Sequence, residues 1–258
     1  MSSKIFRKKY SFTMREVEAS LQRKSWWAAL FILPIARRIS LLLLNYTNIK
    51  PNTITFLSFI FVICSAYCYS NGSYFYLILG ALFFEINYLF DCVDGTIARL
   101  KKLQSYFGEF LDWKLDRIRI VIITAALGYG QYKVQNNFLP LILSLLYLGL
   151  NNLILMSRSF HFRILANIGS RATNKQGVVL VRKTSDNVIL KKWLNFTYDR
   201  NFNPYYHDVE TDAIVFVIGA ILNRINCCLI TSSILAALLV VILDLLFFKS
   251  LNKLSKDG

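Results

Sequence analysis

The sequence predicts an all-α membrane protein with six transmembrane helices, preceded by an interfacial amphipathic helix. Hydrophobic residues make up 55% of the 258 residues and charged residues 17%, with a mean hydropathy of +0.44. A soluble domain does not bury that much apolar surface. Residues 51–90 contain no Lys or Arg, whereas residues 1–50 contain ten and residues 158–208 contain nine. Cationic blocks therefore alternate with apolar blocks long enough to cross a bilayer of about 30 Å.

The formal net charge of +15 by itself also suits a nucleic-acid-binding protein. The basic residues flank apolar runs and do not follow a recognition face, so we expect no nucleic-acid partner. The five cysteines lie mostly in apolar runs without the spacing of zinc ligands. They are interpreted as small core residues.

The first apolar stretch begins at Ser25 and is interpreted as interfacial, with a helix over residues 35–46 that lies in the membrane plane. Pro34, Arg37 and Arg38 interrupt it before it reaches the roughly 20 residues that a span requires. Two adjacent tryptophans suit the headgroup level, and the two arginines lie opposite a leucine face. A distorted first span is the alternative interpretation.

Longer apolar runs follow this stretch and predict the six spans. Four of the spans lie near 53–70, 75–93, 107–128 and 138–157, and the block 212–248 holds two more with a break near Asn223-Arg224. Residues 1–50 then form a cytoplasmic N-terminal segment, and residues 51–258 form the six-span domain.

The distribution of basic residues predicts the orientation. The connections at 71–73 and 130–137 hold a single Lys. The N-terminal segment, the turn at 96–105, the long segment at 158–208 and the C-terminal residues hold 25 of the thirty Lys and Arg. The positive-inside rule places these segments, and both termini, in the cytoplasm.

Four aspartates fall within 26 residues. Asp91 and Asp94 lie three apart at the inner end of the second span, and Asp112 and Asp116 lie four apart at the inner end of the third. These spacings put each pair on one helical face, and the short turn makes the two helices antiparallel neighbours. The pairs therefore converge, and four converging carboxylates stay ionised together only if cations neutralise them.

Mg²⁺ or Mn²⁺ is the expected cation, because oxygen ligands suit hard divalent ions and neither histidine lies nearby in the sequence. Two such ions about 4 Å apart clamp the attacking and leaving oxygens of a displacement at phosphorus. Gly95, Ala98 and Gly108 leave room for a ligand, and Arg99 is a cation able to meet phosphate. In the structural alternative, Gly95 and Ala98 serve helix packing and the aspartates pair with the nearby cations Lys114, Arg117 and Arg119.

The stretch Asp91-x2-Asp94-Gly95-x2-Ala98-Arg99-x8-Gly108-x3-Asp112-x3-Asp116, called the signature below, resembles the complete signature of the CDP-alcohol phosphotransferase family. All eight fixed positions match. Pro51-Asn52-Thr53-Ile54-Thr55 resembles the family's start of the first span, and six spans with cytoplasmic ends resemble its plan. The resemblance does not cover residues 1–24 and 158–208.

The resemblance implies transfer of an alkyl phosphate from a CDP-linked alcohol to a hydroxyl acceptor, with release of CMP. It implies that Asp91, Asp94 and Asp112 bind two divalent ions, and that Asp116 acts as general base and also contacts a metal. It further implies that the cytidine and diphosphate are bound by Asp94, Gly95, Ala98, Arg99 and Gly108.

The identity of the substrates stays open between two cases. Chain length favours CDP-diacylglycerol as donor and a polar alcohol as acceptor, with Arg158, Arg163 and Arg171 available to bind a phosphorylated acceptor. The alternative role of these arginines is anchoring beside anionic headgroups. The signature also allows a soluble donor of the CDP-choline, CDP-ethanolamine or CDP-inositol type with a lipid or inositol-phosphate acceptor.

The alternative from another class is an ion-coupled transporter, for which Glu85 and Asn87 lie at a suitable depth in the second span. The position of the four aspartates near the inner ends of regular spans favours the enzyme. The resemblance also implies a homodimer. We expect an integral membrane protein whose site faces the cytoplasm, in the cell membrane of a bacterium or the endoplasmic reticulum of a eukaryote.

Overall fold

The computed structural model describes residues 11–21, 24–168, 192, 195–197 and 208–254. Within this part of the chain, the regular elements that extend over several residues are all helices. In chain order they are α1 (Met14–Ser20), η1 (Ala28–Ile32), α2 (Leu33–Tyr46), α3 (Pro51–Asn71), α4 (Tyr74–Leu100), α5 (Tyr106–Gln135), α6 (Leu139–Ile168), α9 (Asp208–Asp212), η3 (Ala213–Ile218), α10 (Gly219–Ile221) and α11 (Ile225–Leu254).

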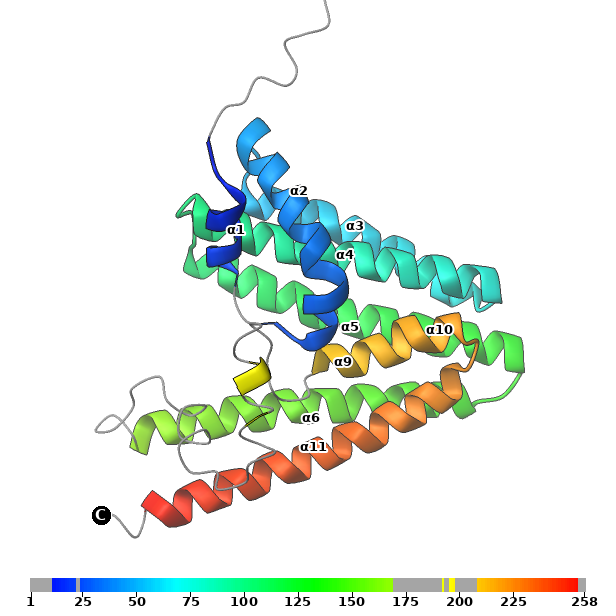
Figure 1. The fold of residues 1–258 in the computed structure, drawn as a ribbon. Helices are drawn as coiled ribbons and strands as arrows, with labels where there is room; N and C mark the ends of the chain where they lie inside the picture. Colours follow the sequence, from blue (N-terminus) through cyan, green and yellow to red (C-terminus); the bar gives the residue numbers. More distant parts are fainter. Residues whose placement is uncertain (1–10, 22–23, 169–191, 193–194, 198–207, 255–258) are drawn as a thin grey trace, which may run out of the picture.

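The long helices α3, α4, α5, α6 and α11 run along one another in a bundle (Figure 1). α3 packs on α4 and α5, α5 packs on α6, and α6 packs on α11. The turn between α4 and α5 and the C-terminal ends of α6 and α11 lie at the same end of the bundle (Figure 1). α2 packs on α4 and crosses the long helices at a steep angle (Figure 1).

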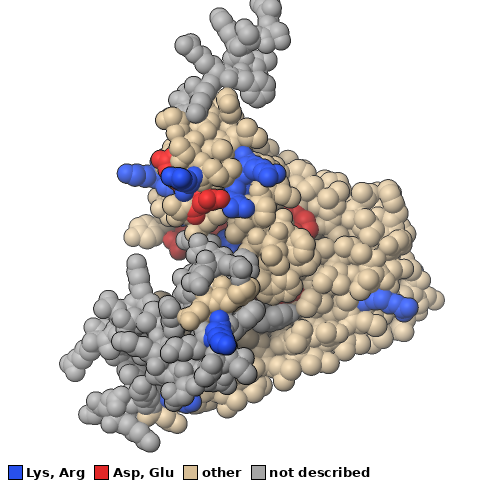
Figure 2. All heavy atoms as spheres, viewed as in Figure 1, with Lys and Arg blue, Asp and Glu red and all other residues tan. Residues whose placement is uncertain are grey.

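Five helices in the described part of the chain are long and apolar enough to cross a membrane. They are Ala28–Tyr46, Pro51–Asn71, Tyr74–Leu100, Leu139–Ile164 and Ile225–Lys249. The N-terminal half of α5 carries six charged residues, which lower its hydropathy. Much of the face seen in Figure 2 is uncharged, and charged atoms gather on it near α1 and α2. The prediction of an all-helical membrane protein is confirmed at this level.

Helix boundaries agree with the sequence in some places and differ in others. The predicted break near Asn223-Arg224 is present, because α10 ends at Ile221 and α11 begins at Ile225. The predicted connection at 130–137 is wrong in extent, since α5 continues through Gln135 and ends at Asn136, which adopts a left-handed φ of 47°. The helix predicted at 138–157 likewise extends as α6 to Ile168.

Two glycines lie where the end of α3 meets α5. A Cβ atom at Gly130 would lie 1.9 Å from the carbonyl oxygen of Tyr69, so the backbones of α3 and α5 touch there. Gly72 ends α3 with a φ of 75°, a conformation that favours glycine. Gly130 therefore serves close helix packing instead of ending the helix.

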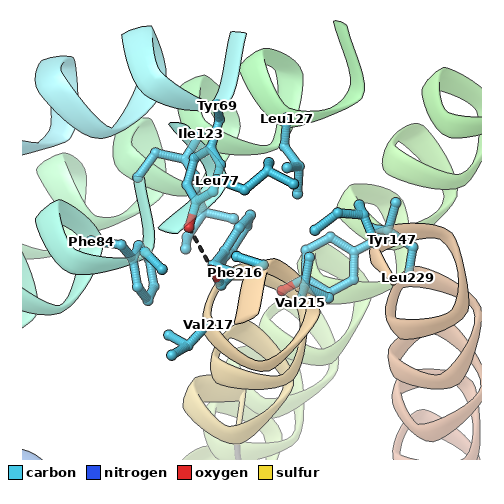
Figure 3. Close-up of a cluster of buried hydrophobic side chains, with 14 of the residues drawn as sticks. Tyr69, Leu77, Phe84, Ile123, Leu127, Tyr147, Val215, Phe216, Val217 and Leu229 are labelled. Carbon is cyan, nitrogen blue, oxygen red and sulfur yellow. Dashed lines mark hydrogen bonds between the residues drawn. The ribbon is translucent and has the colours of Figure 1, made fainter. Parts of the chain in front are cut away.

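The core of the bundle forms around Phe216 in η3 (Figure 3). The hydroxyl of Tyr69 donates a hydrogen bond of 2.6 Å to the carbonyl oxygen of Phe216. The Phe216 ring contacts those of Phe84, at 5.0 Å between centroids, and Tyr147, at 6.0 Å. These contacts join η3 to α3, α4 and α6 and fix the middle of the bundle.

A second core lies where the N-terminal elements cover the inner half of α4. Val17 of α1 and Ala28 of η1 are fully buried in it, beside Cys92 and Ile97 of α4. The backbone of Phe12 exchanges two hydrogen bonds with the Asn45 side chain, at 2.9 and 3.0 Å. α1, η1 and α2 are therefore packed against the part of α4 that carries the signature.

Candidate active site

Three of the four signature aspartates meet between α4 and α5. One carboxylate oxygen each from Asp91, Asp112 and Asp116 lies within 4.8 Å of the other two. A turn joins α4 to α5, and Lys102 adopts a left-handed φ of 55° in it. α3 packs on both helices. We call the three aspartates the aspartate triad.

Among the described residues, Asp94 does not join the triad. It contacts α3 instead. Its carboxylate is 5% exposed and accepts a hydrogen bond from the Thr55 hydroxyl. Oγ1 of Thr55 also lies 3.2 Å from the carbonyl oxygen of Pro51. The polar start of α3 is thus connected directly to the signature.

The small signature residues lie where space is limited. A Cβ atom at Gly95 would lie 3.3 Å from Nη1 of Arg99, so this glycine leaves room for the guanidinium. A Cβ atom at Gly108 would lie 3.4 Å from Oδ1 of Asn52. The Gly108 amide donates at 3.0 Å to Oγ of Ser105, which caps α5. Ala98 is half-buried on α4.

The signature arginine contacts the N-terminal segment. Nε of Arg99 donates a hydrogen bond of 2.7 Å to the carbonyl oxygen of Ser20, at the end of α1. Its Nη2 lies 3.4 Å from the hydroxyl of Thr96. The backbone of a segment outside the signature thus orients this arginine.

Lys24 is a residue of the site that the sequence did not indicate. It is half-buried, and its pKa is raised by Cys92, Asp91 and Asp116, in that order, against the opposing effects of burial and of Arg99. Because an ordinary thiol is neutral near pH 7, the two carboxylates are the charged partners. These carboxylates therefore favour the charged form of Lys24.

Arg119 is a buried cation directly beneath the triad. Its Nη2 lies 3.0 Å from Oδ1 of Asp116, and its Nη1 donates at 2.9 Å to Oδ1 of Asn87. The Asn87 amide in turn donates at 3.0 Å to the carbonyl oxygen of Ser58 in α3. The sequence also allowed the aspartates to pair with nearby cations, and for Asp116 this ion pair, with Arg119, is present. It holds one of the two carboxylate oxygens of Asp116.

A small cavity lies between α3, α4 and α5 and contains the triad. It combines polar groups with apolar walls, and its lining residues are Thr55, Ser58, Phe59, Val62, Asn87, Asp91, Asp112, Leu115, Asp116 and Arg119. Three carboxylates in contact with a cavity are hard oxygen ligands, and they fit Mg²⁺ or Mn²⁺ in chemistry and in mutual distance.

The arginines predicted to bind the acceptor lie farther along the chain. Arg158 is half-buried and Arg163 is exposed, both in the C-terminal part of α6. Neither is among the described residues that line the cavity, and Arg171 lies outside the described residues.

The two residues that suited a transporter are engaged in contacts between helices. Glu85 accepts a hydrogen bond of 3.0 Å from the indole nitrogen of Trp27. Asn87 connects Arg119 to α3, as described above. These contacts favour packing roles for both residues.

Comparison with known proteins gives one family. Residues 48–186 match the family model described as CDP-alcohol phosphatidyltransferase, a range that contains α3 to α6 and the whole signature. The match leaves out α1, η1 and α2, which pack on the inner half of α4.

Curated relatives match over about a hundred residues. An archaetidylinositol phosphate synthase from Methanothermobacter thermautotrophicus is 33% identical over 102 residues, which is 40% of this chain and 47% of the relative. A bifunctional IPC transferase and DIPP synthase from Aquifex aeolicus is 31% identical over 113 residues, 44% of this chain and 25% of the relative. An uncharacterized protein from Aquifex aeolicus is 33% identical over 102 residues, 38% of this chain and 50% of the relative. The chain thus spans half or less of the length of these relatives.

Proposed function

This chain belongs to the CDP-alcohol phosphatidyltransferase family, and from that premise we propose that it transfers a substituted phosphoryl group from a CDP-linked alcohol to the hydroxyl of an alcohol acceptor. The second product is CMP. The observation that carries the proposal is the aspartate triad, in which three carboxylates from two helices approach within 4.8 Å of one another beside a cavity.

The proposed cofactor is a pair of Mg²⁺ or Mn²⁺ ions. Asp91, Asp112 and Asp116 supply ligands from the triad, and Asp94 is the fourth candidate ligand from the same stretch. When bound, such ions neutralise the diphosphate and stabilise charge on the leaving oxygen. The approach of three carboxylate oxygens to within 4.8 Å of one another supports this assignment.

The protein residues have separate roles in the proposed reaction. Arg99 and the small residues Gly95, Ala98 and Gly108 form the pocket for the cytidine and diphosphate. Asp116 accepts the proton of the acceptor hydroxyl, and Arg119, at 3.0 Å from Oδ1, orients its carboxylate.

The bonds and charges of this transfer balance without a further reactant. The acceptor oxygen forms a bond to the phosphorus that carries the donor's alcohol, and the bridging bond of the diphosphate breaks. The electron pair of that bond leaves with CMP, and the acceptor proton passes to Asp116 and then to solvent. The products are a phosphodiester and CMP.

The proposed placement in the membrane has six spans. These are α3, α4, α5, α6, the stretch from α9 to α10, and α11, with both termini in the cytoplasm and the triad at the cytoplasmic end. α2 lies in the membrane plane in this placement. Its steep angle to the bundle supports this position over a seventh span (Figure 1). The excess of Lys and Arg at the signature end supports the cytoplasmic location of that end.

We propose a CDP-linked lipid, CDP-diacylglycerol in the first instance, as donor and a polar alcohol as acceptor. The name of the archaetidylinositol phosphate synthase refers to an inositol phosphate lipid, which makes inositol phosphate the first acceptor to test. Arg158, Arg163 and Arg171 are proposed to bind its phosphate. A soluble CDP-alcohol with a lipid acceptor is the alternative, and a homodimer is the proposed assembly.

The test is CMP release by the purified protein in detergent or nanodiscs. CDP-diacylglycerol is offered with a panel of polar alcohols that includes inositol phosphate, glycerol phosphate and serine, and CDP-choline is offered with diacylglycerol. Asp91→Asn serves as the inactive control. If CMP is released only from the pair CDP-choline and diacylglycerol, the donor is the soluble CDP-alcohol and the acceptor is the lipid. No CMP release from any pair would contradict the proposed function.

A further inference from the structure

The guanidinium of Arg99 is held at two points beside α4. Its Nε donates a hydrogen bond of 2.7 Å to the carbonyl oxygen of Ser20, and its Nη2 donates one of 3.4 Å to the hydroxyl of Thr96. A Cβ atom at Gly95 would lie 3.3 Å from Nη1, so the guanidinium lies beside this glycine. Of the five N–H donors of a guanidinium, these bonds use two and leave three for a phosphate.

Ser20 supplies its carbonyl oxygen because it is the last residue of α1. The last carbonyl groups of a helix have no partner within the helix. The next residue, Leu21, is extended, with φ of −69° and ψ of 130°, and its amide donates back to the carbonyl oxygen of Glu18 at 3.2 Å. The carbonyl of Ser20 is thus left to a donor outside α1, and Arg99 is that donor.

α1 is anchored by its own contacts, so this oxygen has a defined position. Val17 is fully buried in the core that α1 shares with α4. A capping box of Thr13 and Glu16 closes the N-terminal end of α1. Glu18 forms an ion pair of 2.7 Å with Arg37 of α2, and α1 packs on both α2 and α4. These contacts hold α1 in place independently of the signature arginine.

A fixed guanidinium favours ligand binding. Arg99 is a long side chain in the last turn of α4, and such a side chain loses rotamer freedom when it binds a phosphate. A hydrogen bond that already holds the guanidinium removes part of this cost before the ligand arrives. Because Ser20 occupies Nε, donors on both Nη atoms are left for the ligand.

We propose that α1 is a positioning element of the active site, which holds Arg99, through the carbonyl oxygen of Ser20, in the conformation that binds the diphosphate of the CDP-linked donor. This role rests on the proposed function. It assigns a part in donor binding to a helix outside the region that matches the family, residues 48–186.

The rival role for α1 is packing alone, in which it stabilises the inner half of α4 and does not affect the donor. A variant that turns the Ser20 carbonyl and leaves α1 in place separates the two roles. Leu21→Pro is that variant, because proline disfavours the helical conformation of the residue before it. The φ of −69° at Leu21 already suits proline. Leu21→Ala is the matched control, since it removes the same side chain without the restriction on Ser20.

The first test is calorimetric titration of the full chain with CDP in Mg²⁺. Leu21→Pro is expected to bind CDP about tenfold more weakly than Leu21→Ala, the low end of the contribution of a hydrogen bond to a charged group. Leu21→Ala is expected to stay within about twofold of the unchanged protein.

The same pair of variants is then compared in an Arg99→Gln background. Equal CDP binding by Leu21→Pro and Leu21→Ala is expected there, because the arginine through which α1 acts is gone. A tenfold difference that persists without Arg99 would mean that α1 acts by packing, and the proposed role would be wrong.

A second measurement uses the unchanged protein, so it does not depend on a variant that folds. Coupling between two sites is reciprocal, so if α1 strengthens CDP binding, bound CDP strengthens the docking of α1 by the same factor. Hydrogen exchange of residues 14–21 is followed by mass spectrometry in Mg²⁺ alone and in Mg²⁺ with CDP. CDP is expected to slow this exchange by about tenfold. The connection around Asn136, at the other end of α5, is the control and is expected to be unchanged.

Failure of the proposed function has a different result. If the unchanged protein binds no CDP in Mg²⁺, the donor class is wrong and the role of α1 is refuted with it. If the unchanged protein binds CDP, the role of α1 alone is refuted by equal binding to Leu21→Pro and Leu21→Ala, or by exchange in residues 14–21 that CDP does not slow.

Discussion

Replacement of Arg119 by Met is expected to destabilise the protein and to make its stability depend more strongly on divalent ions. The guanidinium lies 3.0 Å from the Asp116 carboxylate and 2.9 Å from the Asn87 side chain, which is itself bound to α3. The change leaves the Asp116 charge without this partner inside the bundle. Removing one partner of a buried pair is more costly than never burying the pair, because the remaining charge is still desolvated.

The size of the loss follows from burial. The side chain of Arg119 is 9% exposed and that of Asp116 is 31% exposed. Breaking a fully buried pair costs about 3–5 kcal/mol, and the partial exposure of Asp116 places the expected loss near the lower limit, about 3 kcal/mol. For a chain of this size, a loss of about 3 kcal/mol lowers Tm by roughly 6–12 °C.

The assay is thermal unfolding followed by tryptophan fluorescence, in chelator and in Mg²⁺. Arg37→Met is the matched control, because its ion pair with Glu18 is exposed by 34% and 47% and contributes about 1 kcal/mol or less. Arg119→Lys keeps the charge but reaches only one of the two partners, so an intermediate loss is expected. Mg²⁺ at the triad replaces part of the missing charge, and it is expected to raise Tm more in Arg119→Met than in the unchanged protein.

Two results would refute this reasoning. Equal losses in Arg119→Met and Arg37→Met would mean that the buried pair contributes no more than an exposed one. An equal effect of Mg²⁺ on Arg119→Met and on the unchanged protein would mean that Arg119 is not coupled electrostatically to the triad.

Three further predictions concern the reaction and the topology. Chelation of divalent ions should abolish CMP release and Mg²⁺ or Mn²⁺ should restore it; full activity in excess chelator contradicts the two-metal proposal. Asp116→Asn should lower kcat by about 10²–10⁴ with donor binding largely kept, whereas Asp112→Asn should weaken binding of Mg²⁺ and donor together; the reverse pattern exchanges their roles. A cysteine at Gln104 should react only from the cytoplasm, and one at Gln135 only from the opposite side. The native Cys227 is exposed and should be labelled from the same side as a cysteine at Gln135, because the neighbouring Asn226 is hydrogen-bonded to Gln135 at 2.7 Å. Labelling of each position from the side opposite to the one expected contradicts the orientation.

The sequence alone determined the features that depend on local periodicity. Apolar runs of span length predicted the long helices, and the polar pair Asn223-Arg224 predicted the break before α11. The fixed spacing of the signature predicted the approach of the aspartate pairs, because residues three or four apart share a helical face and a short turn makes neighbouring helices antiparallel. Helix ends were less certain from the sequence, since the packing of Gly130 against Tyr69 carries α5 past its predicted end.

Only the tertiary structure decided which partner each charged side chain meets. Asp94 shares a face with Asp91 by spacing, yet it lies outside the triad and binds Thr55 of α3. Arg119 was one of three cations near Asp116 in the sequence, and packing against α4 and α3 selects it as the buried partner. The position of Lys24 had no sequence signal, because the residues around it follow no helical period. Long-range contacts of Ser20 and Trp27 with α4 flank it in the sequence, and such contacts depend on which surfaces are buried together and not on the order of neighbouring residues.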